Sequence, residues 1–562
     1  MLNKKFIIIL TLSLLYQSSL SSKSTSFGEF NSKNLSKYFS GIVAFENKDN
    51  SIALNYFNSS KILINQHDPY LERFVMSLVL EDKVNHAVNY IKANSKKNNS
   101  NFFEAYILLA LDSIEKNNID KALKILSEVP EELQKDRFNY IIINSLKEYL
   151  YVFKNKKILK VKKNFNNLSF IADTFQRCYV GDINTGSYFS KLVNDSQADY
   201  SRYIFFYLTY LIENKQIEEA KSITDKLDFI NSSLLLSQGK SWIESNELNK
   251  FSEVFSCKNH NDVIGELLYL ISNLYSAQNE FEKSNFYLSL SNHINPKFVF
   301  NLSLVAENLY LNENYEKSRI ILRNFNKDQD FYYWYRSKKE AQIISKTRNK
   351  KEALNYITSK FEKIKNPNNK FIFDIANFYK NSKEYDQAIK HYSLIINSLP
   401  ENAEIKSDLL YRRGASYERL KDYSNADKDL LRSLEINADD AYVLNYLAYS
   451  WLERDYKIDK AIEMLENAYA SKSDDPYIID SIGWAYYLIN DFIKAEIFLK
   501  RAVELMPEDP IVNDHYADIL WRLDRKIQAR YFWSMVLKME DAEQDLINQI
   551  QTKLVEGPKN SQ

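Results

Sequence analysis

The chain has 562 residues, with 74 basic and 74 acidic side chains and no formal net charge, and it contains only 9 Gly, 9 Pro and 2 Cys. So few Gly argue against α/β enzymes with phosphate loops, barrels and sandwiches, because these folds use Gly at turns and bulges. Zero net charge argues against nucleic-acid binding, and two Cys exclude a disulfide framework, an iron–sulfur centre and a multi-Cys zinc site.

Residues 1–22 have the layout of a secretory signal. Lys4 and Lys5 precede the apolar run Phe6–Tyr16, and Ser19-Leu20-Ser21 offers a cleavage site. The run is shorter than the ~20 residues that span a bilayer, and no Cys lies near it to carry a lipid. We therefore expect export from the cytosol. An uncleaved N-terminal membrane anchor is the alternative.

From residue 23 onward, small residues recur at intervals near 34. Gly41, Val75 and Ala110 are spaced by 34 and 35 residues, and Ala53, Ala87 and Ala122 repeat the pattern twelve residues later. Between about 130 and 260 the spacing drifts, and helical hairpins are the expected content. The frame returns at 265–298 and continues to 368, with markers at Tyr275, Phe281, Ser284, Pro296, Ala306, Tyr315, Ser318, Leu322, Ala341 and Ala353.

The clearest units occupy 369–543. In the unit 476–509, small residues at Gly483, Ala495 and Ala502 allow two antiparallel helices to approach closely, and Pro507 ends the second helix. The other units, at 369–402, 407–440, 441–475 and 510–543, carry the same residue types at matching offsets. Residues 544–562 are expected to hold the end of a helix and a frayed tail.

This 34-residue pattern closely resembles the tetratricopeptide repeat (TPR) family. The resemblance is carried by Ile482, Gly483, Tyr486, Phe492, Ala495, Leu499, Ala502 and Pro507. It implies an all-α, right-handed superhelical solenoid of antiparallel helix pairs, in which each repeat buries its apolar face against its neighbours. Removing about 22 signal residues leaves room for close to 16 hairpins, which replaces the three or four globular domains suggested by length alone.

In TPR proteins, positions 2, 5, 9, 12 and 13 of a repeat face a concave groove. Transferred to the C-terminal units, these positions predict a peptide-binding groove that contains Tyr411, Tyr442, Asn445, Tyr449, Asp480, Trp484, Tyr487, Asp514, Asp518, Trp521 and Arg522. Aromatic rings, carboxylates and an Arg are the mixture that dominates binding energy in protein interfaces. Packing of some of these rings between repeats is the competing interpretation. The Lys/Asn clamp of chaperone-tail-binding TPRs is absent, because Phe373, Tyr411 and Tyr442 stand at clamp positions.

No motif predicts a catalytic, cofactor or metal site. Gly181 and Gly186 have phosphate-loop spacing, but Ser187 stands where the phosphate-binding Lys is needed, so a turn between helices is expected. Cys257 and His260 have metal-like spacing without a second pair of ligands. His515, between Asp514 and Asp518, is assigned a surface capping or packing role. Export would place Cys178 and Cys257 in an oxidising compartment, and the sequence leaves open whether they pair.

Three stretches narrow the resemblance to exported TPR proteins of the proteobacterial cell envelope: Tyr446–Glu453, Asp480–Tyr487 and Asn513–Arg522. This resemblance implies a location in the bacterial periplasm. The predicted function is a non-enzymatic scaffold or adaptor that binds protein or peptide partners in its groove, without cofactor and without nucleic acid. Peripheral contact with the envelope membrane is an additional expectation. The alternatives are a helical-solenoid hydrolase acting on wall or glycan through an Asp such as Asp514 or Asp518, and a subunit of an outer-membrane assembly machine.

Overall fold

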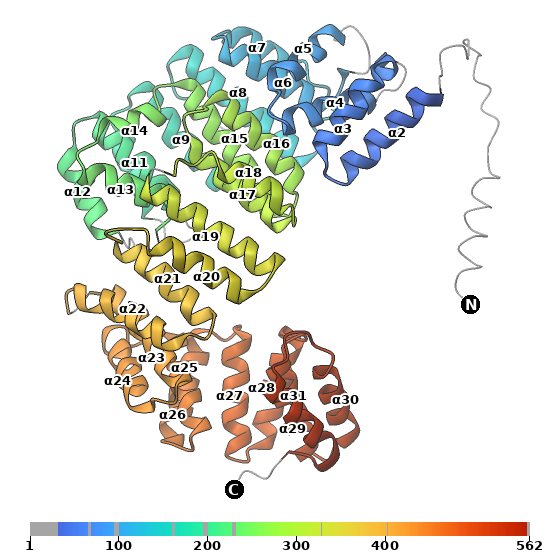
Figure 1. Cartoon of the computed structure of the whole chain (residues 1–562). Helices are drawn as coiled ribbons and strands as arrows, with labels where there is room; N and C mark the ends of the chain where they lie inside the picture. The colour runs from blue at the N-terminus through green and yellow to red at the C-terminus, as the bar shows by residue number, and fades with distance from the viewer. Residues whose placement is uncertain are drawn as a thin grey trace. The chain divides into compact units, whose positions relative to one another are not determined.

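The computed structural model describes residues 32–65, 69–94, 100–159, 163–194, 201–227, 232–327, 329–401 and 403–558, and within these ranges every regular element is a helix. Consecutive helices pack as antiparallel pairs (Figure 1). The predicted all-α fold of paired helices is therefore confirmed. The predicted signal, residues 1–22, lies outside the described residues.

The chain divides into two compact units, each described here by itself. Unit 1 is Met1–Lys226 with Ser233–Phe325, and unit 2 is Asn326–Gln562 with the short segment Leu227–Ser232. The division falls between residues 325 and 326, inside the segment 265–368 that the sequence pattern treats as one block. The interval 130–260, where the repeat spacing drifts, holds helices α8–α14.

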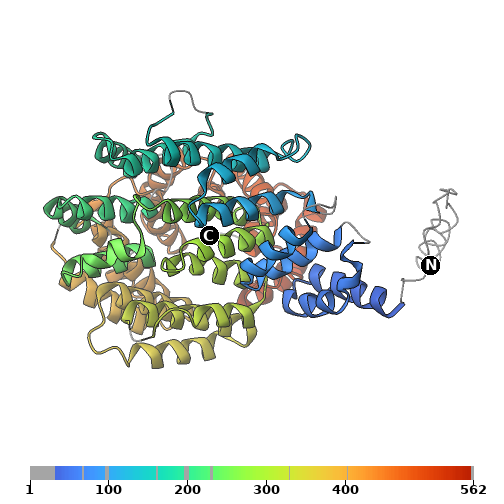
Figure 2. The same cartoon turned by 90° about the horizontal axis from the view of Figure 1, so that it is seen from above.

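Helices of unit 1 run side by side in pairs, as the view from above also shows (Figure 2). Their bounds are α2 (Ser32–Glu46), α3 (Asn50–Ser59), the 3₁₀ turn η2 (Lys61–Asn65), α4 (Pro69–Leu80), α5 (Val84–Asn94), α6 (Phe103–Glu115), α7 (Ile119–Ser127), α8 (Arg137–Asn155), α9 (Asn167–Val180), α10 (Thr185–Val193), α11 (Ser201–Glu213), α12 (Ile217–Lys226), α13 (Leu234–Glu244), α14 (Asn249–Val254), α15 (His260–Ser276), α16 (Phe281–Ile294), the 3₁₀ turn η4 (Val299–Asn301), α17 (Leu302–Leu311) and α18 (Tyr315–Leu322).

Unit 2 contains six helix pairs followed by one single helix. The bounds are α19 (Asp330–Thr347), α20 (Lys350–Phe361), α21 (Asn369–Asn381), α22 (Tyr385–Ser398), α23 (Ile405–Arg419), α24 (Tyr423–Ile436), α25 (Ala441–Glu453), α26 (Ile458–Ser471), α27 (Pro476–Leu488), α28 (Phe492–Leu505), α29 (Pro510–Arg522), α30 (Lys526–Val536) and α31 (Gln544–Glu556).

The turn inside five of the six pairs of unit 2, from α21–α22 onward, uses a left-handed residue that is not glycine. Lys383, Lys421, Asp455, Asn490 and Asp524 all have φ between 54° and 64°. In all five turns the next backbone N–H bonds to a carbonyl five residues back, at 2.9–3.0 Å, which closes the end of the first helix. Asn and Asp tolerate this conformation best, and Lys adopts it at a modest cost. The scarcity of Gly thus reflects turns built from other residues.

Capping residues mark the start of the first helix in each of the last two pairs, α27–α28 and α29–α30. Asp475 and Asp509 each accept hydrogen bonds from the first-turn backbone N–H groups, and each precedes a Pro at the first helical position. Between paired helices the small residues Ala495 and Ala502 are fully buried. One apolar core then runs through α24–α31 and contains the buried rings of Trp451 and Trp533.

The end of the chain differs from the helix end and frayed tail assigned to 544–562. Gln544–Glu556 form a separate helix, α31, and Gly557 packs against the ring of Trp521. The repeat pattern does not predict this packing, because α31 lacks that pattern. Among the described helices, none combines the length and apolar character that crossing a membrane requires.

Candidate functional site

The predicted groove residues on α23 and α25 are open to solvent to different degrees. Tyr442 is 50% exposed, whereas Tyr411, Asn445 and Tyr449 are half-buried. The ring of Tyr411 meets that of Tyr446 edge to face at 5.6 Å, which is packing between neighbouring first helices. Asn445 Oδ1 is buried without a hydrogen-bond partner. These four residues combine aromatic surface with an unmet acceptor, a combination that suits a peptide ligand.

Trp484 links this open stretch to the last two repeats. Its ring stacks on Tyr487 at 4.6 Å and on His515 at 4.1 Å, and its indole N–H donates to Glu453 at 3.0 Å. Arg522 in turn donates to the hydroxyl of Tyr487 at 3.1 Å. Trp484, Tyr487 and His515 thus form one stack of rings across α27 and α29, with Arg522 hydrogen-bonded to Tyr487.

Beside this stack lies a cluster of buried charged groups, which we name the carboxylate cluster: Asp480, Asp514, His515, Asp518, Trp533 and Lys553. The ammonium of Lys553 lies 2.8 Å from both carboxylate oxygens of Asp514 and 2.9 Å from one oxygen of Asp518. The indole N–H of Trp533 donates to the same two residues at 3.0 and 3.2 Å. Asp514 and Asp518 are neighbours because they are four residues apart on α29.

His515 is buried within this cluster, which corrects its assignment to a surface role. Its Nδ1 lies 2.8 Å from Asp480 Oδ2, on the neighbouring first helix, and 6% of the residue is exposed. Burial by itself would lower the pKa of His515, but Asp480, Asp514 and Asp518 together outweigh burial and raise it. The pair therefore favours the imidazolium form and links α27 to α29.

Burial also changes the acidity of the carboxylates. The pKa of Asp518 is raised to about 6 by burial and by the neighbouring Asp514, while Lys553 and His515 act in the opposite direction. Burial disfavours the charged form of Lys553, but Asp518 and Asp514 outweigh it and raise its pKa. A raised carboxylate pKa is also a property of catalytic acids. Here, however, both carboxylates are held by Lys553 and Trp533, an arrangement suited to binding a cation.

The structure therefore brings seven of the eleven predicted groove residues together: Asp480, Trp484, Tyr487, Asp514, Asp518, Trp521 and Arg522. Tyr411, Tyr442 and Asn445 lie on the more open stretch. Tyr449 lies between that stretch and the cluster, since burial and then the charges of Glu453, Asp480 and Asp514 raise its pKa. Two contributors were not predicted. Trp533 lies on a second helix, and Lys553 lies on α31, beyond the last repeat. A lone Lys outside the repeat frame carries no sequence signal for such a role.

Two motifs set aside in the sequence are explained by the fold of unit 1. Gly181 has φ 72° and ends α9, so the phosphate-loop-like spacing is a turn between α9 and α10, as predicted. Cys257 is bonded to Cys178 in a disulfide with a Cα–Cα distance of 5.8 Å. This resolves the pairing that the sequence left open. His260 Nε2 lies 3.3 Å from the carbonyl oxygen of Ile114.

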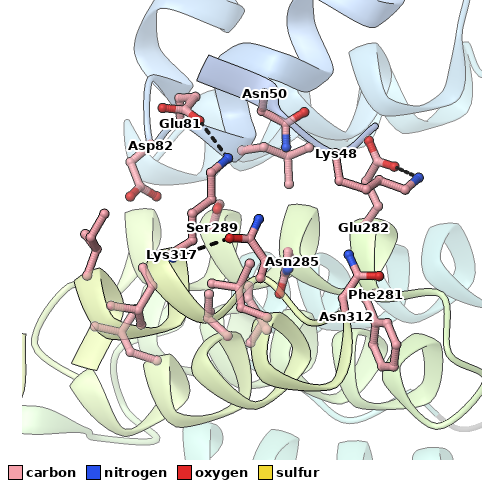
Figure 3. Close-up of a pocket in the computed structure, with 18 of the residues that line it drawn as sticks. Lys48, Asn50, Glu81, Asp82, Phe281, Glu282, Asn285, Ser289, Asn312 and Lys317 are labelled. Atoms are coloured by element: carbon pink, nitrogen blue, oxygen red, sulfur yellow. Dashed lines mark hydrogen bonds and ion pairs between the residues drawn. The ribbon is translucent and has the colours of Figure 1, made fainter. Parts of the chain in front are cut away.

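Unit 1 also holds a cavity of about 350 Å³ (Figure 3). The α2–α3 and α4–α5 turns lie on one side of it and helices α16–α18 on the other. Two ion pairs bridge the sides: Lys48 with Glu282 at 2.6 Å, and Lys317 with Glu81 at 3.7 Å. Burial raises the pKa of Asp82 at the rim. The cavity has the size of a small-ligand site, but its two lysines are already paired with carboxylates.

Sequence reasoning missed this cavity because its two sides are distant in the chain. Residues near 48–82 meet residues near 281–321, and nothing in the repeat pattern indicates which turns face which helices.

Comparisons with known proteins were made for the whole chain. The family model described as tetratricopeptide repeat matches residues 407–440, the extent predicted for the unit formed by α23 and α24. A curated relative, TPR repeat-containing protein PA4667 of Pseudomonas aeruginosa, is 31% identical over 126 residues. That alignment covers 22% of this chain and 21% of the relative, so the chain spans about a fifth of that protein's length.

Solved structures with similar architecture share little sequence with this chain. The APC/C hetero-tetramer Cut9–Hcn1 is 14% identical over 93% of this chain and 97% of its own, with a TM-score of 0.38. A tetratricopeptide repeat protein from Parabacteroides merdae is 15% identical over 51% and 97%, with a TM-score of 0.36. The family match assigns the repeat at residues 407–440 to the tetratricopeptide repeats, and the helices on either side of it are likewise paired.

Proposed function

We propose that this protein is a non-enzymatic scaffold that binds a segment of a partner protein on the first helices of unit 2. The observation that carries the proposal is the row formed by Tyr442, Asn445, Tyr449 and Trp484 on α25 and α27. It joins exposed and half-buried aromatic surface to a buried amide oxygen without a partner. Trp and Tyr are among the residues that most often contribute the largest share of the binding energy in protein interfaces.

The partner contact can be tested directly at Tyr442. A photo-crosslinking amino acid at this exposed position, in the full-length protein in its native cells, should capture a specific partner that mass spectrometry identifies. Trp484→Ala should reduce the yield of that crosslink at least fivefold, because it removes the ring at the centre of the row.

Ile493→Ala serves as the matched control, since Ile493 is 76% exposed on the second helix α28. If both substitutions leave the crosslink unchanged in folded protein, the row does not bind the partner.

We further infer that the protein works in the cell envelope after export. Two observations support this inference: the signal-like pattern of residues 1–22 and the pairing of the two cysteines, Cys178 and Cys257. Disulfides persist in oxidising compartments and are rare in the reducing cytosol. The location is tested by osmotic-shock fractionation combined with alkylation of free thiols. Recovery with a cytosolic marker and two reactive thiols would contradict export.

A further inference from the structure

Helix α31 lies outside the repeats and packs against the last of them, α29–α30. Near its C-terminal end, Lys553 binds Asp514 and Asp518 of α29, and Arg530 of α30 donates to the carbonyl oxygen of Leu554 at 2.9 Å. At the residue before its start, Glu543 pairs at 2.8 Å with Lys383 in the α21–α22 turn, 160 residues earlier. The helix therefore rests on the first-helix residues that the sequence predicts to line a groove.

The apolar attachment of α31 is small. Ile550 is its one fully buried residue, and Leu546 and Leu554 pack only partly against the core. By contrast, nine residues of the equally long α29 are buried. An element with few buried apolar side chains opens at a lower free-energy cost than the core around it. The contacts made by Lys553 therefore account for much of what holds α31 in place.

The two carboxylates of α29 receive their direct cationic contact from outside the repeats. Once Lys553 is removed, the hydrogen-bond donor that remains to Asp514 and Asp518 is the indole N–H of Trp533, and the remaining positive charge nearby is His515, which is paired with Asp480. Both residues are at most 6% exposed, and a buried carboxylate without a cation is strongly destabilising. The site is therefore a receptor for a positive charge that another segment supplies.

The geometry also restricts which segment fits. Three carboxylate oxygens lie 2.8–2.9 Å from one nitrogen, which matches the compact ammonium of Lys and its three donors better than the planar fork of Arg. Four residues after Lys553, Gly557 adopts φ 80° and lies against Trp521, where a Cβ would overlap the indole ring. The site thus fits a helix that has a Lys in its last turn and a Gly just after its end.

We propose that Asp514, Asp518 and Trp521 form a docking site for a partner helix that carries such a lysine, and that α31 occupies this site until the partner helix replaces it. This proposal rests on the proposed function, because it assumes that partners bind on the first helices of unit 2. It specifies the chemistry of the partner helix and identifies α31 as a competitor for the same site within the chain. Any binding helix must then displace Lys553 before it can reach the two carboxylates.

The test uses the full-length protein and a labelled peptide with the α31 sequence, Gln544–Pro558. Fluorescence anisotropy should show at least tenfold tighter peptide binding to the Lys553→Ala protein than to the wild type, because the internal lysine no longer competes. The peptide carrying Lys553→Met should lose at least tenfold in affinity for the Lys553→Ala protein. Equal affinity of both peptides, or no binding of either, would overturn the proposal.

A second variant guards against misfolding of Lys553→Ala. Gly557→Ala loosens the end of α31 without leaving a buried carboxylate unpaired, so it should also raise peptide affinity over the wild type. In the wild-type protein, backbone amides of α31 should exchange hydrogen at least 100-fold faster than those of α29. Equal exchange rates would show that α31 is a permanent part of the core.

The two proposals fail separately. If a partner crosslinks at Tyr442 but the α31 peptide does not bind, only the proposal of a docking site for a lysine-bearing helix is contradicted. A peptide that binds as expected, without any crosslink at Tyr442, would remove the open row as the partner site and leave the docking chemistry standing.

Discussion

The ammonium of Lys553 lies within 2.8 Å of both carboxylate oxygens of Asp514, across 39 residues of chain. The side chains are 17% and 8% exposed, so the pair is largely shielded from water. Removing one partner of a buried ion pair leaves the other charge uncompensated, which is more costly than the pair itself is stabilising. The end of unit 2 should therefore depend strongly on this lysine.

Replacing Lys553 by Met should lower the free energy of unfolding of this region by about 3 kcal/mol, because Asp514 and Asp518 lose their cation. Urea unfolding followed by tryptophan fluorescence measures the change, since Trp521 and Trp533 lie in the same region. The exposed Lys500 provides the control, and Lys500→Met should have little effect. Equal effects of the two substitutions would contradict a structural role for the Lys553 pair.

The stability of the carboxylate cluster should fall as pH rises. The pKa of His515 is raised in the folded state, so its contribution is complete below its unfolded pKa, about 6.5, and is lost as pH rises through the folded value. The pKa of Asp518 is raised to about 6, so the folded state also holds its proton more tightly than the unfolded state does. Both groups therefore favour the folded state at lower pH.

The measurement compares each variant with the wild type, because other carboxylates of the protein impose their own pH trends. Between pH 4.5 and 8, the free energy of unfolding of the wild type minus that of His515→Gln should decrease, and so should the difference from Asp518→Asn. A flat difference for both variants would show that neither group titrates differently on folding.

Close packing at Gly483 should make an added methyl group costly. A Cβ at this position would lie 2.8 Å from Leu499 Cγ and 3.0 Å from Phe498 Cβ on the paired helix. Overpacking costs about 1–3 kcal/mol, partly offset by the better helix propensity of Ala, so Gly483→Ala should destabilise by about 1 kcal/mol. Thermal unfolding measures the change in stability. Ala448 stands at the equivalent position in the preceding repeat, so Ala448→Gly is the reciprocal control. A Gly483→Ala protein that is more stable than the wild type would show that α28 shifts freely to make room for the methyl group.

The disulfide should stabilise unit 1 substantially. Cys178 and Cys257 are 79 residues apart in sequence and both are buried, so the bond restricts a long loop of the unfolded chain. Replacing both by Ala should lower the free energy of unfolding by about 2–4 kcal/mol in chemical denaturation. Dithiothreitol should lower the stability of the wild type by a similar amount and leave the double variant unchanged. Insensitivity of the wild type would argue against the bond.

The sequence by itself determined the fold class, because the residues that specify each helix pair lie close together in the chain. Small residues such as Ala495 and Gly483 decide how closely two helices pack, and Asp–Pro at 475–476 starts a first helix, all within one 34-residue unit. Which face of a first helix points away from its partner follows from the same periodicity. The resemblance to the TPR family adds which positions face a groove, and it predicts that Trp484 and Asp514 share one surface.

Only the tertiary structure decided what that surface holds. Lys553 lies on a helix without the repeat pattern, and its partner Asp514 is fixed by how α31 folds back on α29. The bond between Cys178 and Cys257 and the cavity beside Lys48 and Glu282 likewise join segments many residues apart. Periodicity describes how residues within one repeat pack. Contacts between distant segments depend instead on how successive helix pairs are placed relative to one another, and no single repeat contains that information.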